Sequence, residues 1–157
     1  MQLVDVLKEN MIFLNFEASN KEEAIEKFIN SLDKTGTIKE PNALKDALLE
    51  REKLGTTGIG QGIAMPHARS SAIKDLTVAF FRSEKGIDFK SMDSEPVHLV
   101  FLLLAPVTAG GPYLKLLAKI SRLLRGDDFR NSLMEAKDVS SVLQIIQDND
   151  WLGKSFV

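Results

Sequence analysis

Cysteine is absent from this chain of 157 residues, and histidine occurs only twice. The absence of cysteine excludes disulfides, thiol nucleophiles and cysteine-based metal sites, and it fits a cytoplasmic location. Two histidines are too few for a histidine-rich zinc site. The sequence therefore predicts no metal centre.

Long apolar runs are also absent, and neither sign of charge dominates. The longest apolar run, Leu99 to Val107, is far shorter than the roughly 20 residues that span a bilayer. The N-terminus, Met1 to Asp5, lacks the basic and apolar segments of a secretory signal. The net charge of −2 gives no general attraction to nucleic acid or anionic membranes. We expect a cytoplasmic protein that neither binds nucleic acid nor inserts into a membrane.

What is present is the composition of an ordinary globular protein, with 44% hydrophobic and 27% charged residues. The length suits one domain with a substantial core. We predict one domain over residues 1–150, followed by a C-terminal tail over residues 151–157. Trp151 and Phe156 in that tail either pack back on the domain or face a partner.

Apolar residues recur with helical spacing in several segments. They predict helices that begin after Asn20, after Pro41, at Tyr113, near Asp127 and after Asp138. Asn20 and Asp138 have the side chains of N-caps, and a glycine at position 36 is suited to end the first of these helices.

Other segments have the pattern of strands. Alternating or continuous apolar residues predict strands over residues 12–16, 63–65, 77–82 and 97–104, and the polar segment 83–95 is expected to be a loop or a short hairpin. Because helices and strands are interspersed, we predict an α/β fold: a single domain with a central mixed β-sheet flanked by helices on both sides. In such folds sites gather at the carboxyl ends of strands, which makes the Ala105–Pro112 turn one wall of a site.

The helix after Pro41 carries a cationic residue on its apolar side. Leu44, Leu48 and Leu54 lie on one side at helical spacing, with Ala47 among them. Arg51 falls four residues after Ala47 and therefore projects inward near the helix end. An arginine there either complements the helix dipole or serves the loop that follows.

That loop contains glycines at alternate positions: Gly58, Gly60 and Gly62. Glycines allow positive φ and close approach of a ligand to the backbone, and clustered N–H groups bind anions. The spacing matches neither a P-loop nor a dinucleotide fingerprint. Glycine alone is therefore a weak signal, and a tight turn into the short strand Ile63–Met65 explains it equally well.

Pro66 and His67 end the loop. The proline fixes one torsion and biases the preceding residue toward an extended form, which holds the histidine in a defined pose. An imidazole with a pKa near ~6.5 is substantially neutral at neutral pH and can act as a nucleophile. Histidine after a cationic helix end and a glycine-rich loop predicts phosphoryl transfer.

Separated stretches of the chain carry further motifs in order: Glu50–Glu52, Thr57–His67, Pro96–Pro106 and Tyr113–Ala118. Together they resemble the signature of the fructose/mannitol-type enzyme IIA domains of the bacterial sugar phosphotransferase system, a family that includes the nitrogen-regulatory IIA proteins. The resemblance spans most of the chain.

The resemblance implies a phosphotransferase mechanism without a cofactor. In the family, the histidine matched by His67 accepts a phosphoryl group from phospho-HPr and passes it to a IIB domain during sugar uptake. The arginine matched by Arg51 would neutralise the developing charge. Thr57, Gly58 and Gly60 are candidate phosphoryl contacts. Association with a membrane IIC component would be indirect, through IIB.

One position departs from the family pattern. Family members usually carry a second histidine where this chain has Tyr113. Tyrosine can donate a hydrogen bond to a phosphoryl oxygen but is not cationic at neutral pH. Tyr113 therefore either binds the phosphoryl group or belongs to the core. Arg69 either assists anion binding or is solvated, and His98, inside an apolar strand, is expected to be packed.

Two functions fit these residues. One is a phosphocarrier for sugar uptake, and the alternative is a regulatory, nitrogen-type enzyme IIA that controls target proteins according to its phosphorylation state. A binding module without transfer activity is disfavoured because Arg51 and His67 are both retained.

Overall fold

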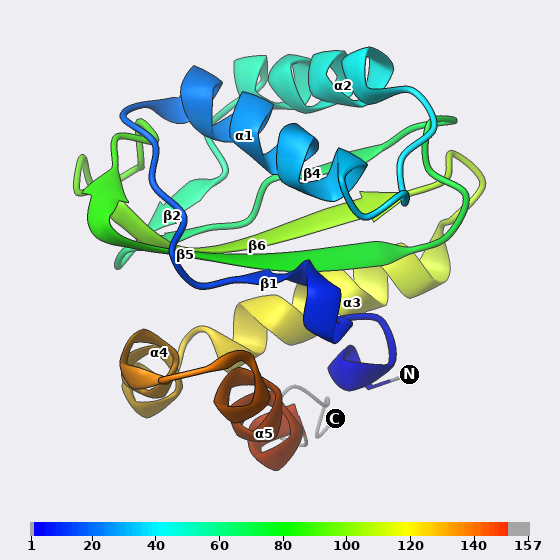
Figure 1. Ribbon diagram of the computed structural model, residues 1–157. Helices are drawn as coiled ribbons and strands as arrows, with labels where there is room; N and C mark the ends of the chain where they lie inside the picture. The colour runs from blue at the N-terminus through cyan, green and yellow to red at the C-terminus, as the bar shows by residue number, and fades with distance from the viewer. Residues whose placement is uncertain (1, 151–157) are drawn as a thin grey trace.

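The most apolar stretch of the chain forms the centre of a mixed β-sheet (Figure 1). The computed structural model describes residues 2–150, so the predicted tail over residues 151–157 lies outside the described residues. The strands are β1 (Ile12–Phe13), β2 (Gly58–Gly60), β3 (Ile63–Ala64), β4 (His67–Arg69), β5 (Thr77–Ile87) and β6 (Val97–Ala105). Their order is β1-β5-β6-β3-β2, with β4 also paired to β6. Strand β6 is antiparallel to β5 and parallel to β3 and β4.

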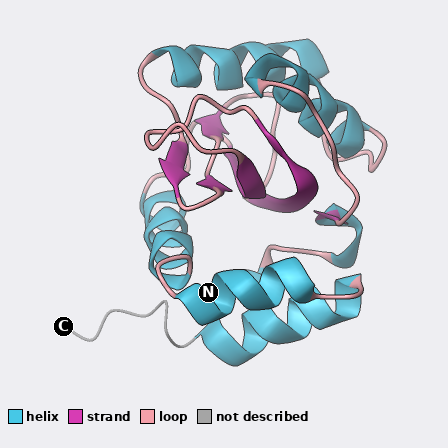
Figure 2. Cartoon of the chain, turned by 90° about the vertical axis from the view of Figure 1, so that its left-hand side faces the viewer, coloured by secondary structure: helices cyan, strands magenta, loops and turns pink. Residues whose placement is uncertain are grey.

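Helices cover both faces of the sheet, which confirms the predicted fold class (Figures 1 and 2). One layer contains α1 and α2, and α3, α4 and α5 lie on the opposite face. The helices are α1 (Lys21–Asp33), α2 (Pro41–Lys53), α3 (Gly111–Leu123), α4 (Asp127–Glu135) and α5 (Val139–Asn149), with short 3₁₀ helices η1 (Leu3–Asp5) and η2 (Glu9–Met11). Within residues 2–150, no helix has the length and apolar character needed to cross a membrane.

Local signals place the helix ends. The Asn20 side chain accepts a hydrogen bond from the Glu23 N–H at 2.9 Å, and the Asp138 side chain accepts one from the Ser141 N–H at 2.7 Å. Both predicted N-caps are confirmed. Gly36, after α1, has a φ of 77°, a left-handed conformation that glycine adopts without steric cost.

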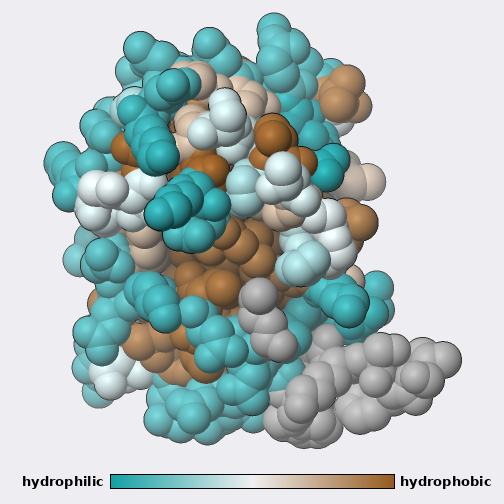
Figure 3. Space-filling view, turned by 90° about the vertical axis from the view of Figure 1, so that its right-hand side faces the viewer, coloured by the Kyte–Doolittle hydropathy of each residue, from teal (hydrophilic) through white to brown (hydrophobic). Residues whose placement is uncertain are grey.

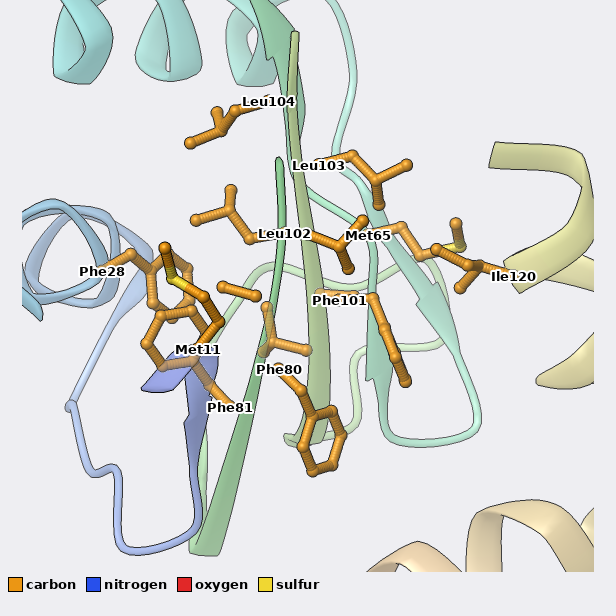
Figure 4. Packing of buried hydrophobic residues seen from close by; sticks show 14 of the residues in the cluster. Met11, Phe28, Met65, Phe80, Phe81, Phe101, Leu102, Leu103, Leu104 and Ile120 are labelled. Atoms are coloured by element: carbon orange, nitrogen blue, oxygen red, sulfur yellow. The ribbon is translucent and has the colours of Figure 1, made fainter. Parts of the chain in front are cut away.

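The core fills both faces of β5 and β6 (Figure 4). Phe81 is fully buried, and its ring lies 4.8 Å from that of Phe13 and 4.5 Å from that of Phe28. Every residue of β6 except His98 is buried. Residues buried on both faces of a central strand produce a continuous apolar run instead of an alternating one.

Two strands end more than one residue away from their predicted ends. Strand β5 continues to Ile87, although the polar residues after Arg82 suggested a loop. Ser83 is buried there, and its carbonyl lies 2.9 Å from Nδ1 of His98, so polar groups are satisfied inside the fold. The register shifts between Arg82 and Ile87, and Gly86, with φ 92°, lies within this irregularity. Strand β1 is shorter than predicted and ends at Phe13.

A single register relates β3 and β4 to the central strand. Ile63 pairs with Leu99, and His67 pairs with Leu103, so both short strands follow β6 in the same alignment. The interruption contains Pro66, which has no N–H to donate. Its carbonyl still accepts a hydrogen bond from the Leu103 N–H at 3.0 Å. The proline therefore breaks the ladder without shifting the histidine.

The two ends of the described chain are joined by one carboxylate. Asp150 Oδ2 accepts a hydrogen bond from the Leu3 N–H at 3.1 Å, and its Oδ1 lies 3.0 Å from Nζ of Lys119. Asp150 is buried. The carboxylate of Asp150 therefore links η1, α3 and the end of α5.

Apolar atoms reach the surface at the end of the molecule toward which β6 runs. Figure 3 shows this face: polar atoms cover the helical layer above, and apolar atoms gather beneath it in the middle. In Figure 1 the loops that follow β4 and β6 lie at this end.

Candidate active site

His67 is the first residue of β4 and not part of an irregular loop. Along this strand His67 is half-buried, Ala68 is buried and Arg69 is exposed. Because side chains alternate across a strand, His67 and Arg69 point to one face and Ala68 to the other. Helix α2 packs against β4, so the end of that helix faces the imidazole.

A backbone carbonyl fixes the tautomer of His67. Nδ1 lies 2.8 Å from the carbonyl oxygen of Met65. A carbonyl only accepts hydrogen bonds, so Nδ1 carries the proton and Nε2 carries the lone pair. The Arg51 Nε–H donates to Nε2 at 3.3 Å. The nucleophilic nitrogen therefore faces a guanidinium group.

The surroundings of His67 favour its neutral form. Burial lowers the pKa of the imidazole most, the hydrogen bond to the Met65 carbonyl raises it, and the positive charge of Arg51 lowers it again. Glu52 raises the pKa by a smaller amount. The net effect is a pKa below the ordinary value of about 6.5. At neutral pH, Nε2 is thus unprotonated and available for attack.

Arg51 lies in the last turn of α2, on the side that the helix phase predicts. A second hydrogen bond, from its Nη1 to the Gly55 carbonyl at 2.9 Å, holds the guanidinium near the helix end. Leu54 lies along the same surface hollow as Ala47 and Arg51, as the helical spacing predicts, but it is 84% exposed. Helix α2 ends at Lys53, and Leu54, the residue after it, still has helical backbone angles.

A buried ion pair holds the chain on the far side of Arg51. Glu52 Oε1 lies 2.9 Å from Nζ of Lys21, on α1. The same carboxylate accepts hydrogen bonds from the N–H and the hydroxyl of Thr57. The Lys21 Nζ also donates to Thr56 Oγ1 at 3.1 Å. Helix α1, the end of α2 and the start of the glycine-rich segment are therefore tied to one carboxylate.

His67 opens into a surface hollow of about 520 Å³. Its walls come from the end of α2, from β4 and from the start of α3; the lining residues are Ala47, Glu50, Arg51, Leu54, His67, Ala68, Arg69, Tyr113, Leu114 and Leu117. The second wall was predicted at the Ala105–Pro112 turn, but no residue of that turn lines the hollow, and the wall comes from the start of α3 instead. The hollow has more room than one phosphoryl group requires, which leaves space for a partner's side chains.

Tyr113 belongs both to the core and to the hollow. It is 5% exposed, and its ring centroid lies 6.2 Å from that of His67. The guanidinium of Arg69 lies 5.7 Å from the Tyr113 ring centroid, within the range of a cation–π contact. Both alternatives for Tyr113 therefore describe part of its position.

Thr57, Gly58 and Gly60 do not line the hollow. Thr57 is buried against Glu52. A Cβ at Gly58 would lie 2.4 Å from Oγ of Ser91, so the glycine is required by close packing. Gly60 has φ 98° and lies beside Asp93. That these residues contact a phosphoryl group stays a prediction to which this geometry adds no support.

The sequence left open whether Arg69 assists anion binding or is solvated, and the exposed apolar residues of the hollow were not predicted to belong to the site. Leu54 is 84% exposed and Leu114 is 62% exposed. Period-two spacing from His67 would have placed Arg69 beside it, had the segment been recognised as a strand. Within residues 2–150, no group of three or more acidic or histidine side chains is placed to hold a metal ion.

A family model matches nearly the whole described chain. It is the model described as "Phosphoenolpyruvate-dependent sugar phosphotransferase system, EIIA 2", and it matches residues 5–149. The chain belongs to this family. The EIIA domains of the family are phosphoryl-transfer components, and its sugar-specific and nitrogen-regulatory branches are both similar to this chain.

Relatives from both branches match most of this EIIA domain. A fructose-specific EIIABC component from Bacillus subtilis is 37% identical over 150 residues, which are 96% of this chain and 24% of that protein. A fructose-specific EIIA component from Haloferax volcanii is 40% identical over 138 residues, 88% of this chain and 90% of that protein. A nitrogen regulatory protein from Bradyrhizobium diazoefficiens is 37% identical over 147 residues, 93% of this chain and 95% of that protein. The chain spans about a quarter of the Bacillus subtilis protein.

Solved structures share the fold of this EIIA domain. The nitrogen regulatory protein IIA-Ntr from Neisseria meningitidis has a TM-score of 0.84 at 33% identity, covering 90% of this chain and 97% of that one. The mannitol enzyme IIA in a complex with phosphorylated enzyme IIB, from Escherichia coli, has a TM-score of 0.76 at 26% identity, covering 91% of this chain and 99% of that one.

The lowered pKa of His67 predicts how its protonation depends on pH. In an NMR titration of the imidazole protons, we expect a midpoint below about 6.5, because burial and Arg51 disfavour the charged form. Phosphoryl acceptance should therefore be maximal well above that midpoint and fall as the pH is lowered through it, because the protonated imidazole has no free lone pair. A midpoint at or above 6.5 would contradict this account of the site.

The buried carboxylate of Glu52 predicts a large loss of stability on Glu52→Gln. The substitution leaves the Lys21 ammonium, whose side chain is 10% exposed, without a counter-charge. Breaking a buried pair in this way costs about 3–5 kcal/mol, measured as the free energy of unfolding in urea.

Glu50→Gln is the matched control for that measurement. Glu50 lies 2.8 Å from Lys53 on the same helix, but both side chains are 70% exposed. Exposed pairs add little to stability, so the control should unfold at nearly the wild-type urea concentration. Equal effects of the two substitutions would show that burial of the Glu52 pair is unimportant.

Proposed function

We propose that this EIIA domain is a cytoplasmic phosphocarrier that accepts a phosphoryl group from phospho-HPr on Nε2 of His67 and passes it to a IIB domain during sugar uptake. One observation carries the proposal: the Met65 carbonyl holds the proton on Nδ1, while Nε2 faces Arg51 at 3.3 Å. This is the arrangement of a neutral nucleophile beside a fixed cation.

The transfer exchanges one nitrogen–phosphorus bond for another. The lone pair of His67 Nε2 forms the new bond, and the donor nitrogen keeps the electron pair of the bond that breaks. Positioning and charge stabilisation supply most of the catalysis in such reactions. Arg51 offers that stabilisation next to the attacking nitrogen, so the reaction requires neither metal nor nucleotide.

The surroundings of the hollow suit protein partners. Leu54 and Leu114 are large apolar side chains that remain 84% and 62% exposed beside the reactive histidine. Exposed apolar groups around a site favour contact with another protein. Donor and acceptor in this proposal are both proteins, and the similar mannitol enzyme IIA is known in a complex with phosphorylated enzyme IIB. Any link to a membrane IIC component would run through IIB.

A regulatory, nitrogen-type role is the second candidate. The observation that favours it is the likeness to IIA-Ntr from Neisseria meningitidis, at a TM-score of 0.84 and 33% identity. The same histidine would then report phosphorylation state to a target protein. Onward transfer from the phosphorylated chain to a fructose-type IIB domain distinguishes the two roles, because only the phosphocarrier needs rapid transfer.

We expect phosphate on His67 after incubation with phosphoenolpyruvate, enzyme I and HPr. The label should be stable in base and labile in acid, and mass spectrometry should place it on His67. His67→Ala should abolish it. His98→Gln, at the other histidine of the chain, is the matched control and should keep the label. Phosphate on the His67→Ala protein would sink the assignment.

Arg51→Gln should slow phosphoryl transfer strongly while the fold is retained. Losing one preorganised donor to a developing charge typically costs about 10²–10³ in rate, and stopped-flow or quench measurements of transfer from phospho-HPr would detect it. Lys53→Gln provides the control, because Lys53 is an exposed cation in the same last turn of α2 and does not line the hollow. If Arg51→Gln kept the wild-type rate, Arg51 would stabilise only the end of α2 and would not take part in transfer.

A further inference from the structure

Arg69 is a second cation on the same face of β4 as His67. The alternation along the strand puts both side chains in the hollow. Two residues along a strand span about 6.6 Å, a distance that an arginine side chain can cover. Arg69 can therefore reach a group bonded to Nε2 without any movement of the backbone.

The present contacts of Arg69 are weak. Its Nη1 donates to the Ala109 carbonyl at 3.4 Å, and its guanidinium lies over the ring of Tyr113. Within the described residues, no carboxylate forms an ion pair with Arg69. A guanidinium without a fixed anionic partner is free to exchange a distant carbonyl for a charged oxygen.

The phosphorylated site needs more positive charge than Arg51 alone provides. A phosphoryl group on nitrogen carries charge on three oxygens, whereas Arg51 also donates to the Gly55 carbonyl. Tyr113 supplies no positive charge, because a protonated phenol is neutral, and burial raises the pKa of its hydroxyl. Arg51 lies 3.3 Å from Nε2 of His67, and the guanidinium of Arg69 lies 5.7 Å from the ring centroid of Tyr113, so both cations lie beside the pair formed by His67 and Tyr113.

We propose that Arg69 is a second phosphoryl-binding residue of this site, held over Tyr113 until the phosphoryl group arrives. When the Nε2–phosphorus bond forms and the donor nitrogen retains its electron pair, the guanidinium leaves the Ala109 carbonyl and binds a phosphoryl oxygen. Before that step, the ring of Tyr113 holds the guanidinium of Arg69 beside the hollow. This inference rests on the proposed function of His67 as phosphoryl acceptor.

The test compares wild type, Arg69→Gln, Arg69→Lys and Lys74→Gln in the full chain. Phospho-HPr is the probe, and the measurement is the equilibrium distribution of phosphate between HPr and this protein. Loss of a charged hydrogen bond predicts that Arg69→Gln lowers the equilibrium constant about ten- to hundred-fold. Arg69→Lys should recover part of the loss, because it restores the charge without the planar fork.

Lys74→Gln is the control for net charge. Lys74 is an exposed cation beyond β4 that does not line the hollow. A ³¹P titration of the phosphorylated proteins gives a readout that a purely structural role would not move. The pKa of the phosphoryl group should rise in Arg69→Gln and stay at the wild-type value in Lys74→Gln, since a nearby cation favours the dianion.

Two negative outcomes are distinct. If wild type takes phosphate on His67 but Arg69→Gln matches Lys74→Gln in both measurements, Arg69 is only a solvated strand residue and the inference is overturned. If wild type takes no phosphate on His67, the proposed function fails and the inference fails with it. Because Arg69 is exposed, its variants should keep the urea midpoint of wild type.

Discussion

The carboxylate of Glu52 is the constraint on which the site depends. It accepts hydrogen bonds from the N–H and the hydroxyl of Thr57 and forms an ion pair with Lys21. Glu52 therefore fixes the end of α2 relative to α1 and to the glycine-rich segment. A buried charge of this kind tolerates few alternative arrangements, because every misplacement leaves a desolvated group unpaired. Arg51 is the residue before this anchor, and its direction toward His67 follows from the helix phase.

The orientation of His67 is set where the strand beside β6 is interrupted. Pro66 has no N–H to donate there, and the carbonyl of the preceding residue, Met65, binds Nδ1 of the imidazole at 2.8 Å. One backbone oxygen thereby decides which nitrogen is nucleophilic. Burial and Arg51 then keep that nitrogen unprotonated. Conformation and tautomer therefore depend on the sequence Met-Pro-His at one sheet position, whereas the charge state depends on burial and on Arg51.

Much of the fold was predictable because its signals are local. The apolar run of β6 and the caps at Asn20 and Asp138 were sufficient to identify these elements. His67 and Arg51 could be identified from the motif and from helix phase. The exposure of Leu54 could not, because periodicity identifies one side of a helix but not how far along that side the packing extends. The place of Arg69 depends on three-residue pairing with β6, a long-range contact that a short polar stretch does not reveal.

The buried ion pair of Asp150 has a consequence beyond stability. Because it binds the backbone of Leu3 and the side chain of Lys119, the first and last described elements meet at one place on the surface of the fold. A longer polypeptide can therefore enter and leave such a domain at neighbouring positions without disturbing the sheet. This geometry suits a domain carried within a longer protein; in the Bacillus subtilis relative, the region that matches this chain is 24% of the whole.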